Sequence, residues 1–124
     1  MITVADVMTK EVVSIEANVT VAQAIAKMRE EEISSLLVKP EGDMDTWGFM
    51  TETDVIEKVV ARRLDANEVL VHDIMSKPVI TVSPQSSLEE CAALLARADI
   101  RRVLVFDGTE MVGIVSSSDI FSAL

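Results

Sequence analysis

The chain of 124 residues has little of several features that mark particular classes of protein. Its single cysteine, Cys91, has no partner for an intramolecular disulfide, which fits a reducing compartment. Its apolar runs are too short for a transmembrane span, and its N-terminus lacks the basic and apolar regions of a signal peptide. We therefore expect a cytoplasmic protein with no membrane partner.

Basic residues and histidine are also scarce. Lysine and arginine total 11 against 21 acidic residues, so the formal net charge is −10. This balance argues against binding nucleic acid or anionic lipid through a broad basic face, although a few local cations can still hold a small anion. His72 is the only histidine, and the sequence has no Ser-His-Asp triad, zinc ligand set or GxxxxGK[ST] loop. We expect no enzyme activity, no catalytic residues and no metal site.

What the chain does contain is the composition of a folded protein and an internal repeat. Apolar residues make up 49 % of the chain, with only 4 glycines and 3 prolines. Asp6–Lys10 (DVMTK) matches Asp73–Lys77 (DIMSK). Further on, and after two extra residues in the first copy, Gly48–Asp54 (GFMTETD) matches Gly113–Asp119 (GIVSSSD). An ordered series of matches of this kind indicates two copies of one unit.

Each copy predicts the order strand, helix, strand, strand, helix. Capping boxes at Thr20–Gln23 and Ser87–Glu90 start the first helix of each copy, and apolar residues follow at helical spacing. Short β-branched runs predict the strands, and turn residues such as Asp107-Gly108 separate them. The expected strands are 12–15 with its counterpart 79–82, 35–39, 47–50, 102–106 and 111–115. The last helices begin near 53 and 118, and the first of them is expected to run to about Leu64.

The repeat also predicts the domain organisation. We assign residues 1–64 to the first repeat, 65–71 to a connector and 72–124 to the second repeat. A repeat of about 55–60 residues is marginal by itself. The connector is short and not rich in glycine or serine. We therefore expect the two repeats to pack about a pseudo-twofold axis rather than to form separate domains.

Together, the paired DhM[ST]K and Ghh[ST]xxD motifs resemble a tandem pair of CBS domains, the regulatory modules named after cystathionine β-synthase. The resemblance covers essentially the whole chain. It implies an α/β (α+β) fold of two β-α-β-β-α repeats with two clefts between them. Many members bind adenosine compounds there, namely AMP, ADP, ATP, S-adenosylmethionine or cyclic dinucleotides. Pairs commonly form homodimers and regulate an attached enzyme or channel, so here we expect a stand-alone module that acts on a separate protein.

The resemblance points first to the Ghh[ST]xxD motif, which supplies Thr51 and Asp54 in the first copy and Ser116 and Asp119 in the second. In the family, the aspartate accepts hydrogen bonds from ribose hydroxyls and the Ser or Thr lies near ribose or phosphate. A carboxylate can accept two such donors, and a helix N-terminus favours phosphate. The same pattern is also an ordinary helix cap, and both interpretations can hold together.

The resemblance also implies cations for the phosphates of the nucleotide. Arg101 and Arg102 stand at the start of a strand where family members often contact phosphate, and their first-copy counterparts are serines. We therefore expect the two sites to differ in their affinity for anions. The alternative is an exposed basic pair or a salt bridge with one of the many carboxylates. Lys10 and Lys77, matched between the copies, are secondary candidates.

For the adenine base, family members use apolar residues around the first strand and the start of the second. These positions are as readily interpreted as plain core. Many members also have proline in the second strand where this chain has Leu37 and Leu104, which leaves the base contacts open. The matching candidates are Val12, Val13, Ile33, Val79, Ile80 and Ile100.

Two functions are therefore open. The first is a sensor that binds AMP, ADP or ATP, with or without magnesium and with no covalent cofactor, and signals the energy state to an unknown partner. The second is a ligand-free scaffold for dimerisation and protein interaction, in which the motifs serve only as helix caps. Substitution of Asp54 and Asp119 separates them, since a lost cap changes stability alone.

Overall fold

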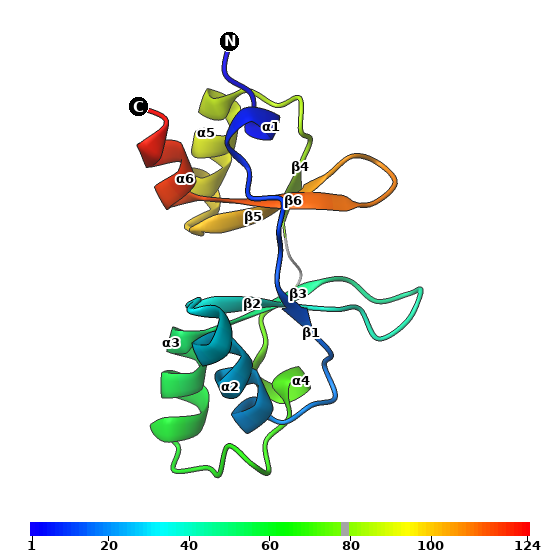
Figure 1. The fold of residues 1–124 in the computed structure, drawn as a ribbon, viewed down its shortest axis with the longest axis vertical. Helices are drawn as coiled ribbons and strands as arrows, with labels where there is room; N and C mark the ends of the chain where they lie inside the picture. Colours follow the sequence, from blue (N-terminus) through cyan, green and yellow to red (C-terminus); the bar gives the residue numbers. More distant parts are fainter. Residues whose placement is uncertain (78–79) are drawn as a thin grey trace. The chain divides into compact units, whose positions relative to one another are not determined.

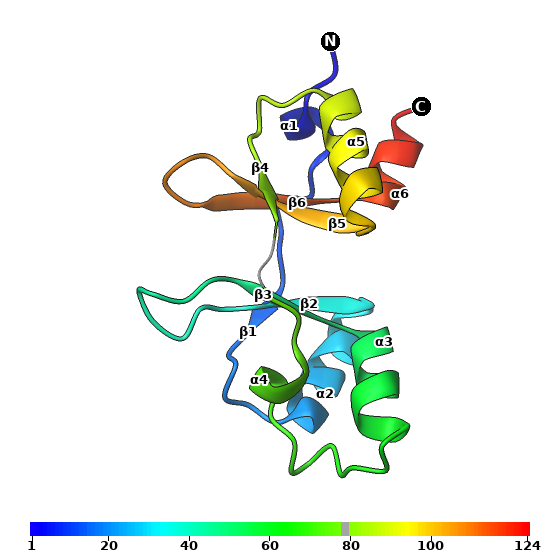
Figure 2. The same ribbon diagram turned by 180° about the vertical axis from the view of Figure 1, so that it is seen from behind.

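A computed structural model of the protein describes residues 1–77 and 80–124, and the chain divides into two compact units. We call Val13–Val79 the central unit, and Met1–Val12 together with Ile80–Leu124 the terminal unit. Each unit contains one three-stranded sheet and several helices (Figures 1 and 2). The predicted mixed α+β fold is therefore confirmed.

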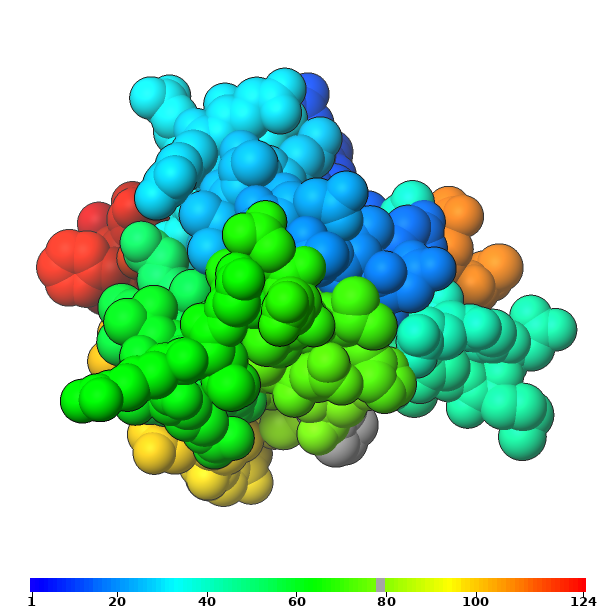
Figure 3. All heavy atoms as spheres, turned by 90° about the horizontal axis from the view of Figure 1, so that it is seen from below, coloured from blue at the N-terminus to red at the C-terminus, as the bar shows by residue number. Residues whose placement is uncertain are grey.

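The central unit is built from the body of the first copy. Its elements are β1 (Ser14–Ile15), α2 (Val21–Glu31), β2 (Ser35–Val38), β3 (Gly48–Thr51), α3 (Glu52–Val55), the π-helical turn η1 (Ile56–Val60) and α4 (Val71–Ile74). Strand β2 lies in the middle of the sheet, parallel to β1 and antiparallel to β3. The β2–β3 connection is long and acidic, and it projects from the unit (turquoise in Figure 3).

The terminal unit repeats this plan with the body of the second copy. Its elements are α1 (Val4–Val7), β4 (Thr81–Val82), α5 (Leu88–Ala98), β5 (Arg102–Phe106), β6 (Met111–Ser116) and α6 (Ser117–Ser122). Strand β5 lies in the middle, parallel to β4 and antiparallel to β6. The parallel pairing puts helix α5 in the crossover from β4 to β5, as α2 crosses from β1 to β2.

The long helices begin and end as their sequences dictate. The predicted capping boxes are both formed, because the Thr20 side chain accepts from Gln23 and the Ser87 side chain accepts from Glu90. At their other ends, Glu32 (φ 55°) and Asp99 (φ 53°) adopt the left-handed conformation that ends many helices. Local chemistry therefore sets both boundaries at equivalent positions in the two copies.

The compact units do not coincide with the sequence repeats, because each copy begins with a segment that packs on the other copy's body. We call these leading segments; they comprise residues 1–12 of the first copy and residues 70–77, which join the end of the predicted connector to the start of the second copy. Thr9 exchanges backbone hydrogen bonds of 2.9 and 3.0 Å with Ile114 of β6. Ser76 does the same with Phe49 of β3, at 2.8 and 3.1 Å.

This pairing explains the glycine that opens each Ghh[ST]xxD motif. A Cβ atom on Gly113 would lie 2.8 Å from the sulfur of Met8 and 2.9 Å from the carbonyl oxygen of Thr9. On Gly48 it would lie 3.2 Å from the carbonyl oxygen of Ser76. The glycine of one motif and the Met-[ST] pair of the other are therefore two sides of one close backbone contact.

Each unit has its own hydrophobic core, and the leading segments contribute to both. Val4 of α1 is fully buried in the terminal core, and Val71 and Ile74 of α4 are buried in the central core. The other buried members of the central core are Ala17, Val21, Ala24, Met28, Leu36, Val38, Met50, Val55 and Val59. Those of the terminal core are Cys91, Leu95, Val103, Val105 and Val115.

Most predicted elements are confirmed, with three differences. The first strand is shorter than expected and covers only Ser14–Ile15. The last helix of the first copy ends at Val60 rather than near Leu64, and its second half is π-helical. The short helices α1 and α4 were not expected at all. Within the described residues, no helix is both long enough and apolar enough to cross a membrane.

Candidate functional site

The two Ghh[ST]xxD motifs adopt the same local structure, at the junction of a strand with a short helix. Thr51 caps α3 and Ser116 caps α6. The Asp54 Oδ2 atom accepts from the Thr51 amide at 2.9 Å and from its hydroxyl at 3.1 Å. The Asp119 Oδ2 atom accepts from the Ser116 amide at 2.8 Å and from its hydroxyl at 3.0 Å. One oxygen of each aspartate therefore serves as a helix cap, as one of the two interpretations requires.

The second carboxylate oxygen distinguishes the copies. The Asp54 Oδ1 atom lies 3.1 Å from the Nζ atom of Lys58, and that ammonium also donates to the carbonyl oxygen of Ile74 at 2.9 Å. Asp54 is buried, with 8 % of its surface exposed. Both of its oxygens are therefore occupied by groups of the central unit.

Asp119 has no such partner among the described residues. The position that corresponds to Lys58 is Ala123, and the Asp119 Oδ1 atom has no hydrogen bond or ion pair within residues 1–77 and 80–124. Asp119 is also partly exposed rather than buried. A charged acceptor that faces solvent is therefore left at the start of α6.

Arg102 lies opposite the residue that caps this helix, Ser116. It is paired with Ser116 in the β5–β6 ladder, and directly opposed residues of an antiparallel pair have their side chains on one face. The Arg102 side chain is half-buried, and no ion pair among the described residues includes it or Arg101. Burial, and next the charge of Arg101, lower the pKa of the Arg102 guanidinium, which still stays charged at neutral pH.

Arg101 immediately precedes β5, and its backbone is held by a hydrogen bond. Its carbonyl oxygen accepts from the Ser117 amide at 2.8 Å. In the first copy, the Ser34 carbonyl accepts from the Glu52 amide at 3.1 Å, and Ser35 is paired with Thr51. The backbone is therefore the same in both copies, and only the second copy carries the cations, as the sequence indicated.

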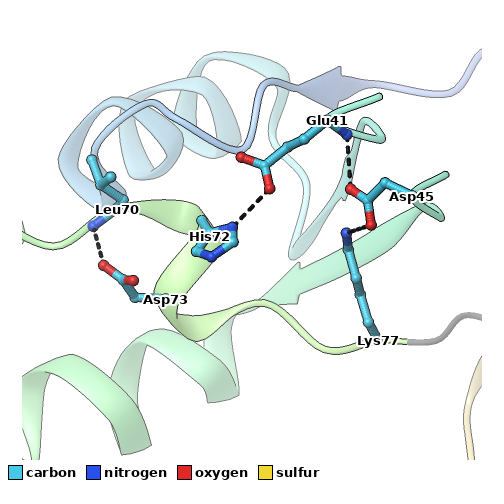
Figure 4. Close-up of polar contacts among 6 residues, drawn as sticks. All are labelled: Glu41, Asp45, Leu70, His72, Asp73 and Lys77. Carbon is cyan, nitrogen blue, oxygen red and sulfur yellow. Dashed lines mark hydrogen bonds and ion pairs between the residues drawn. The ribbon is translucent and has the colours of Figure 1, made fainter. Parts of the chain in front are cut away.

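The two matched lysines have different surroundings. The Lys77 Nζ atom lies 2.5 Å from the Asp45 Oδ1 atom, and the Asp45 Oδ2 atom accepts from the Glu41 amide at 2.8 Å (Figure 4). The Lys77 ammonium, together with the backbone amides of Glu41 and Thr46, lowers the pKa of the Asp45 carboxyl to about 2. Lys77 is therefore committed to the β2–β3 connection, whereas Lys10 is exposed and forms no ion pair among the described residues.

A neighbouring side-chain contact in Figure 4 involves the same connection. The His72 Nδ1 atom of α4 lies 2.8 Å from the Glu41 Oε2 atom. Both side chains are exposed, so the contribution of this pair to stability is small. Together with the Lys77–Asp45 pair, it ties the acidic connection of the first copy to the second copy's leading segment.

The apolar candidates for an adenine site fall largely into the cores. Val13 and Ile33 pack against the central core, and Ile100 packs against the terminal core. Val12 is partly buried, Ile80 is 36 % exposed, and Val79 lies outside the described residues. Among the described candidates, Ile80 therefore has the most accessible apolar surface.

The leucines that replace the proline of many family members lie in regular strands. The Leu37 amide donates to the Val13 carbonyl at 3.2 Å, and the Leu104 amide donates to the Ile80 carbonyl at 3.1 Å. A proline at either position could not make this bond. The backbone between the first and second strands of each copy therefore follows an ordinary parallel pairing.

Metal ligands do not gather in the described part of the chain, where no three His, Cys, Asp or Glu side chains form a cluster suited to an ion. Cys91 is fully buried in the terminal core, and burial raises the pKa of its thiol. A buried thiol with a raised pKa is a poor nucleophile.

Sequence reasoning missed Lys58, although a signal for it was present. An Asp and a Lys four residues apart on a helix commonly form an ion pair. Aligning the copies places Ala123 at the equivalent position, which would have shown that this pair is confined to the first copy.

Comparison with known proteins agrees with this architecture. The family model of the CBS domain matches residues 4–61 and again 71–124, so the chain belongs to the CBS domain family. Proteins with a pair of these domains are commonly regulatory and ligand-binding modules.

The chain is similar to an uncharacterized protein of Methanopyrus kandleri, at 35 % identity over 96 % of this chain and 61 % of that protein. It is 29 % identical to the CBS domain-containing protein YhcV of Bacillus subtilis, over 97 % of this chain and 84 % of that one. Among solved structures, the hexameric CBS-CP12 protein from bloom-forming cyanobacteria matches with a TM-score of 0.88 and 38 % identity, over 98 % of this chain and 70 % of that chain. The chain thus spans less than two thirds of the Methanopyrus protein.

Proposed function

We propose that the chain is a regulatory module that binds an adenosine nucleotide, AMP, ADP or ATP, at the Ser116–Asp119 motif of the terminal unit. One observation carries the proposal. The Arg102 side chain is half-buried, has no acidic partner among the described residues, and is paired with Ser116 in the β5–β6 ladder. Ser116 caps helix α6 together with Asp119, whose Oδ1 atom has no hydrogen bond or ion pair among the described residues.

The chemistry of these groups suits the parts of a nucleotide. The Asp119 Oδ1 atom can accept from a ribose hydroxyl while Oδ2 continues to cap the helix. Arg102, and Arg101 next to it, can donate to phosphate oxygens, and an arginine makes paired hydrogen bonds to phosphate. Ile80 offers exposed apolar surface for the base. A magnesium ion would accompany the phosphates of ADP or ATP.

The test is thermal unfolding with AMP, ADP, ATP with and without magnesium, S-adenosylmethionine and cyclic di-AMP. A ligand at 100 times its Kd adds about 2.7 kcal/mol to the free energy of unfolding, which raises the Tm by several degrees. Asp119→Asn is the matched variant, because an amide oxygen can still cap the helix while the charge is lost. We expect a selective shift that Asp119→Asn clearly reduces; no shift with any compound contradicts the proposal.

The proposed function further requires that nucleotide binding change how the module interacts with a partner protein. A nucleotide acts as a signal only if it binds one arrangement of the module better than another, typically by about 1–3 kcal/mol. We propose a partner in a separate chain, and a pull-down with and without the active nucleotide tests it. Equal recovery of partner in both conditions contradicts a nucleotide-dependent signal.

A ligand-free scaffold is the competing function, and one pair of residues favours self-association in either case. Ile56 of η1 and Phe121 of α6 occupy matched positions in the two copies, and they are 59 % and 76 % exposed. Exposed apolar side chains mark a protein interface where they form a contiguous patch. The hexameric state of the cyanobacterial relative supports self-association. We propose that this chain associates as a homodimer, which sedimentation of wild type and Phe121→Asp would test.

A further inference from the structure

We propose that only one of the two motifs accepts the nucleotide, because in the central unit Asp54 is buried and its Oδ1 atom is already paired with Lys58. This inference rests on the proposed function and assigns its site to the terminal unit alone. The two motifs would then have different tasks, one as a ligand site and the other as a fixed structural junction.

The Lys58 ammonium is well placed to exclude a ligand. It lies 3.1 Å from the Asp54 Oδ1 atom and donates to the Ile74 carbonyl at 2.9 Å. The Lys58 side chain is 32 % exposed and that of Asp54 only 11 % exposed. A hydroxyl that displaced Lys58 would separate a largely buried ion pair and leave the Ile74 carbonyl without its donor.

The surroundings of Asp54 also disfavour the phosphates. Where the terminal unit has Arg101 and Arg102, the central unit has Ser34 and Ser35 on an equivalent backbone. The first residue of the short helix is an exposed Glu52, whereas the terminal unit has Ser117 there. The central motif therefore lacks the attractive charges and adds a repulsive one.

Lys58 has a second role that explains its position. Ile74 ends α4, and the next residues lead to Ser76, which is hydrogen-bonded to β3. The lysine therefore joins the motif of the first copy to the leading segment of the second. In the terminal unit, Ala123 stands at the equivalent position and cannot make this link.

Calorimetric titration with AMP, ADP and ATP tests the inference on the full chain. We expect one nucleotide per wild-type chain, binding weakened about tenfold or more by Asp119→Asn, and less than about twofold change with Asp54→Asn. The gain-of-function variant combines Lys58→Met with Ser34→Arg and Ser35→Arg and should bind two nucleotides per chain. Its matched control has both arginine substitutions but keeps Lys58, and it should still bind one.

The outcomes separate the inference from the function on which it rests. No binding by the wild-type chain would overturn both. Two nucleotides per wild-type chain, or binding weakened by Asp54→Asn, would overturn the one-site inference and leave the proposed function intact. A gain-of-function variant that keeps its far-ultraviolet circular dichroism and its original site, yet binds one nucleotide, would also overturn the role assigned to Lys58.

Discussion

Asp54 and Asp119 come from the same motif, cap equivalent helices with nearly equal distances, and differ in what their second oxygen contacts. In the central unit that oxygen holds Lys58; in the terminal unit it has no partner among the described residues, and Arg102 stands nearby. A repeated motif therefore shows where a chain folds alike. Whether it is used alike depends on neighbours outside the motif, four residues along the helix and one strand away.

The largest effect should come from removing each carboxylate in turn. Asp54→Ala removes a helix cap and leaves the Lys58 ammonium largely without its counter-charge, so we expect the free energy of unfolding to fall by about 2–4 kcal/mol. Asp119→Ala removes only a cap and should cost about 1 kcal/mol. Urea unfolding without ligand measures both, and equal losses would contradict the difference between the copies.

The next effect concerns the two glycines. Gly113→Ala puts a Cβ atom 2.8 Å from the Met8 sulfur and 2.9 Å from the Thr9 carbonyl oxygen, which requires backbone movement. We expect a loss of about 1–3 kcal/mol. Gly48→Ala meets its nearest atoms at 3.2 Å and should cost less than Gly113→Ala. Denaturant unfolding of the two variants gives the order, and the reverse order would show that the leading segment on β6 adjusts more easily than the one on β3.

Arg102 should show a conflict between stability and binding. Its half-buried guanidinium lacks an acidic partner among the described residues, and methionine retains an apolar stem without the charge. We expect Arg102→Met to raise the free energy of unfolding by about 0.5–1 kcal/mol while it weakens nucleotide binding about tenfold or more. Ser35→Met is the matched control in the central unit and should leave binding unchanged.

The smallest expected effect is a difference in acid titration between Asp45 of the β2–β3 connection and Asp107 of the β5–β6 connection. The pKa of Asp45 is lowered from 3.8 to about 2 chiefly by Lys77, and that of Asp107 is lowered by the backbone amides of Glu110 and Thr109. A carboxyl with a lowered pKa in the folded state contributes stability that is fully present above its unfolded pKa. For Asp45, that contribution is lost as the pH falls from about 4 through about 2.

Carboxyl NMR titration of both aspartates tests this difference. High salt should raise the pKa of Asp45, which depends on a cation, more than that of Asp107, which depends on backbone donors. Lys77→Met should move the pKa of Asp45 toward its ordinary value and leave that of Asp107 unchanged. An equal response of the two groups would mean that Lys77 is not the main cause.

What could be predicted from the sequence was the local part of the fold. The capping boxes at Thr20 and Ser87 and the β-branched strands act over a few residues, so they are visible in the sequence. The short helix α1 is different, because its first amides donate to the carbonyls of Ser86 and Pro84, far along the chain. Such long-range anchoring, and with it the placing of each leading segment on the other copy's body, leaves no local pattern.

The candidate site was predictable to a similar degree. The motif residues and the difference between Arg102 and Ser35 could be found by aligning the copies. The state of each carboxylate was predictable only in part. The spacing of Asp54 and Lys58 favours an ion pair, but the burial of Asp54 and the bond from Lys58 to the Ile74 carbonyl depend on the tertiary structure. The core packing of Val13, Ile33 and Ile100 likewise emerges only from the tertiary structure.

The leading segments have a consequence for the order of events during protein synthesis. The central unit is one continuous stretch, so all of it has been made once α4 has left the ribosome. Residues 1–12 are made before the central unit, but their partners on β6 and beside α5 are made after it. Since chains fold as they emerge, a segment that is translated before the central unit is expected to find its place after it.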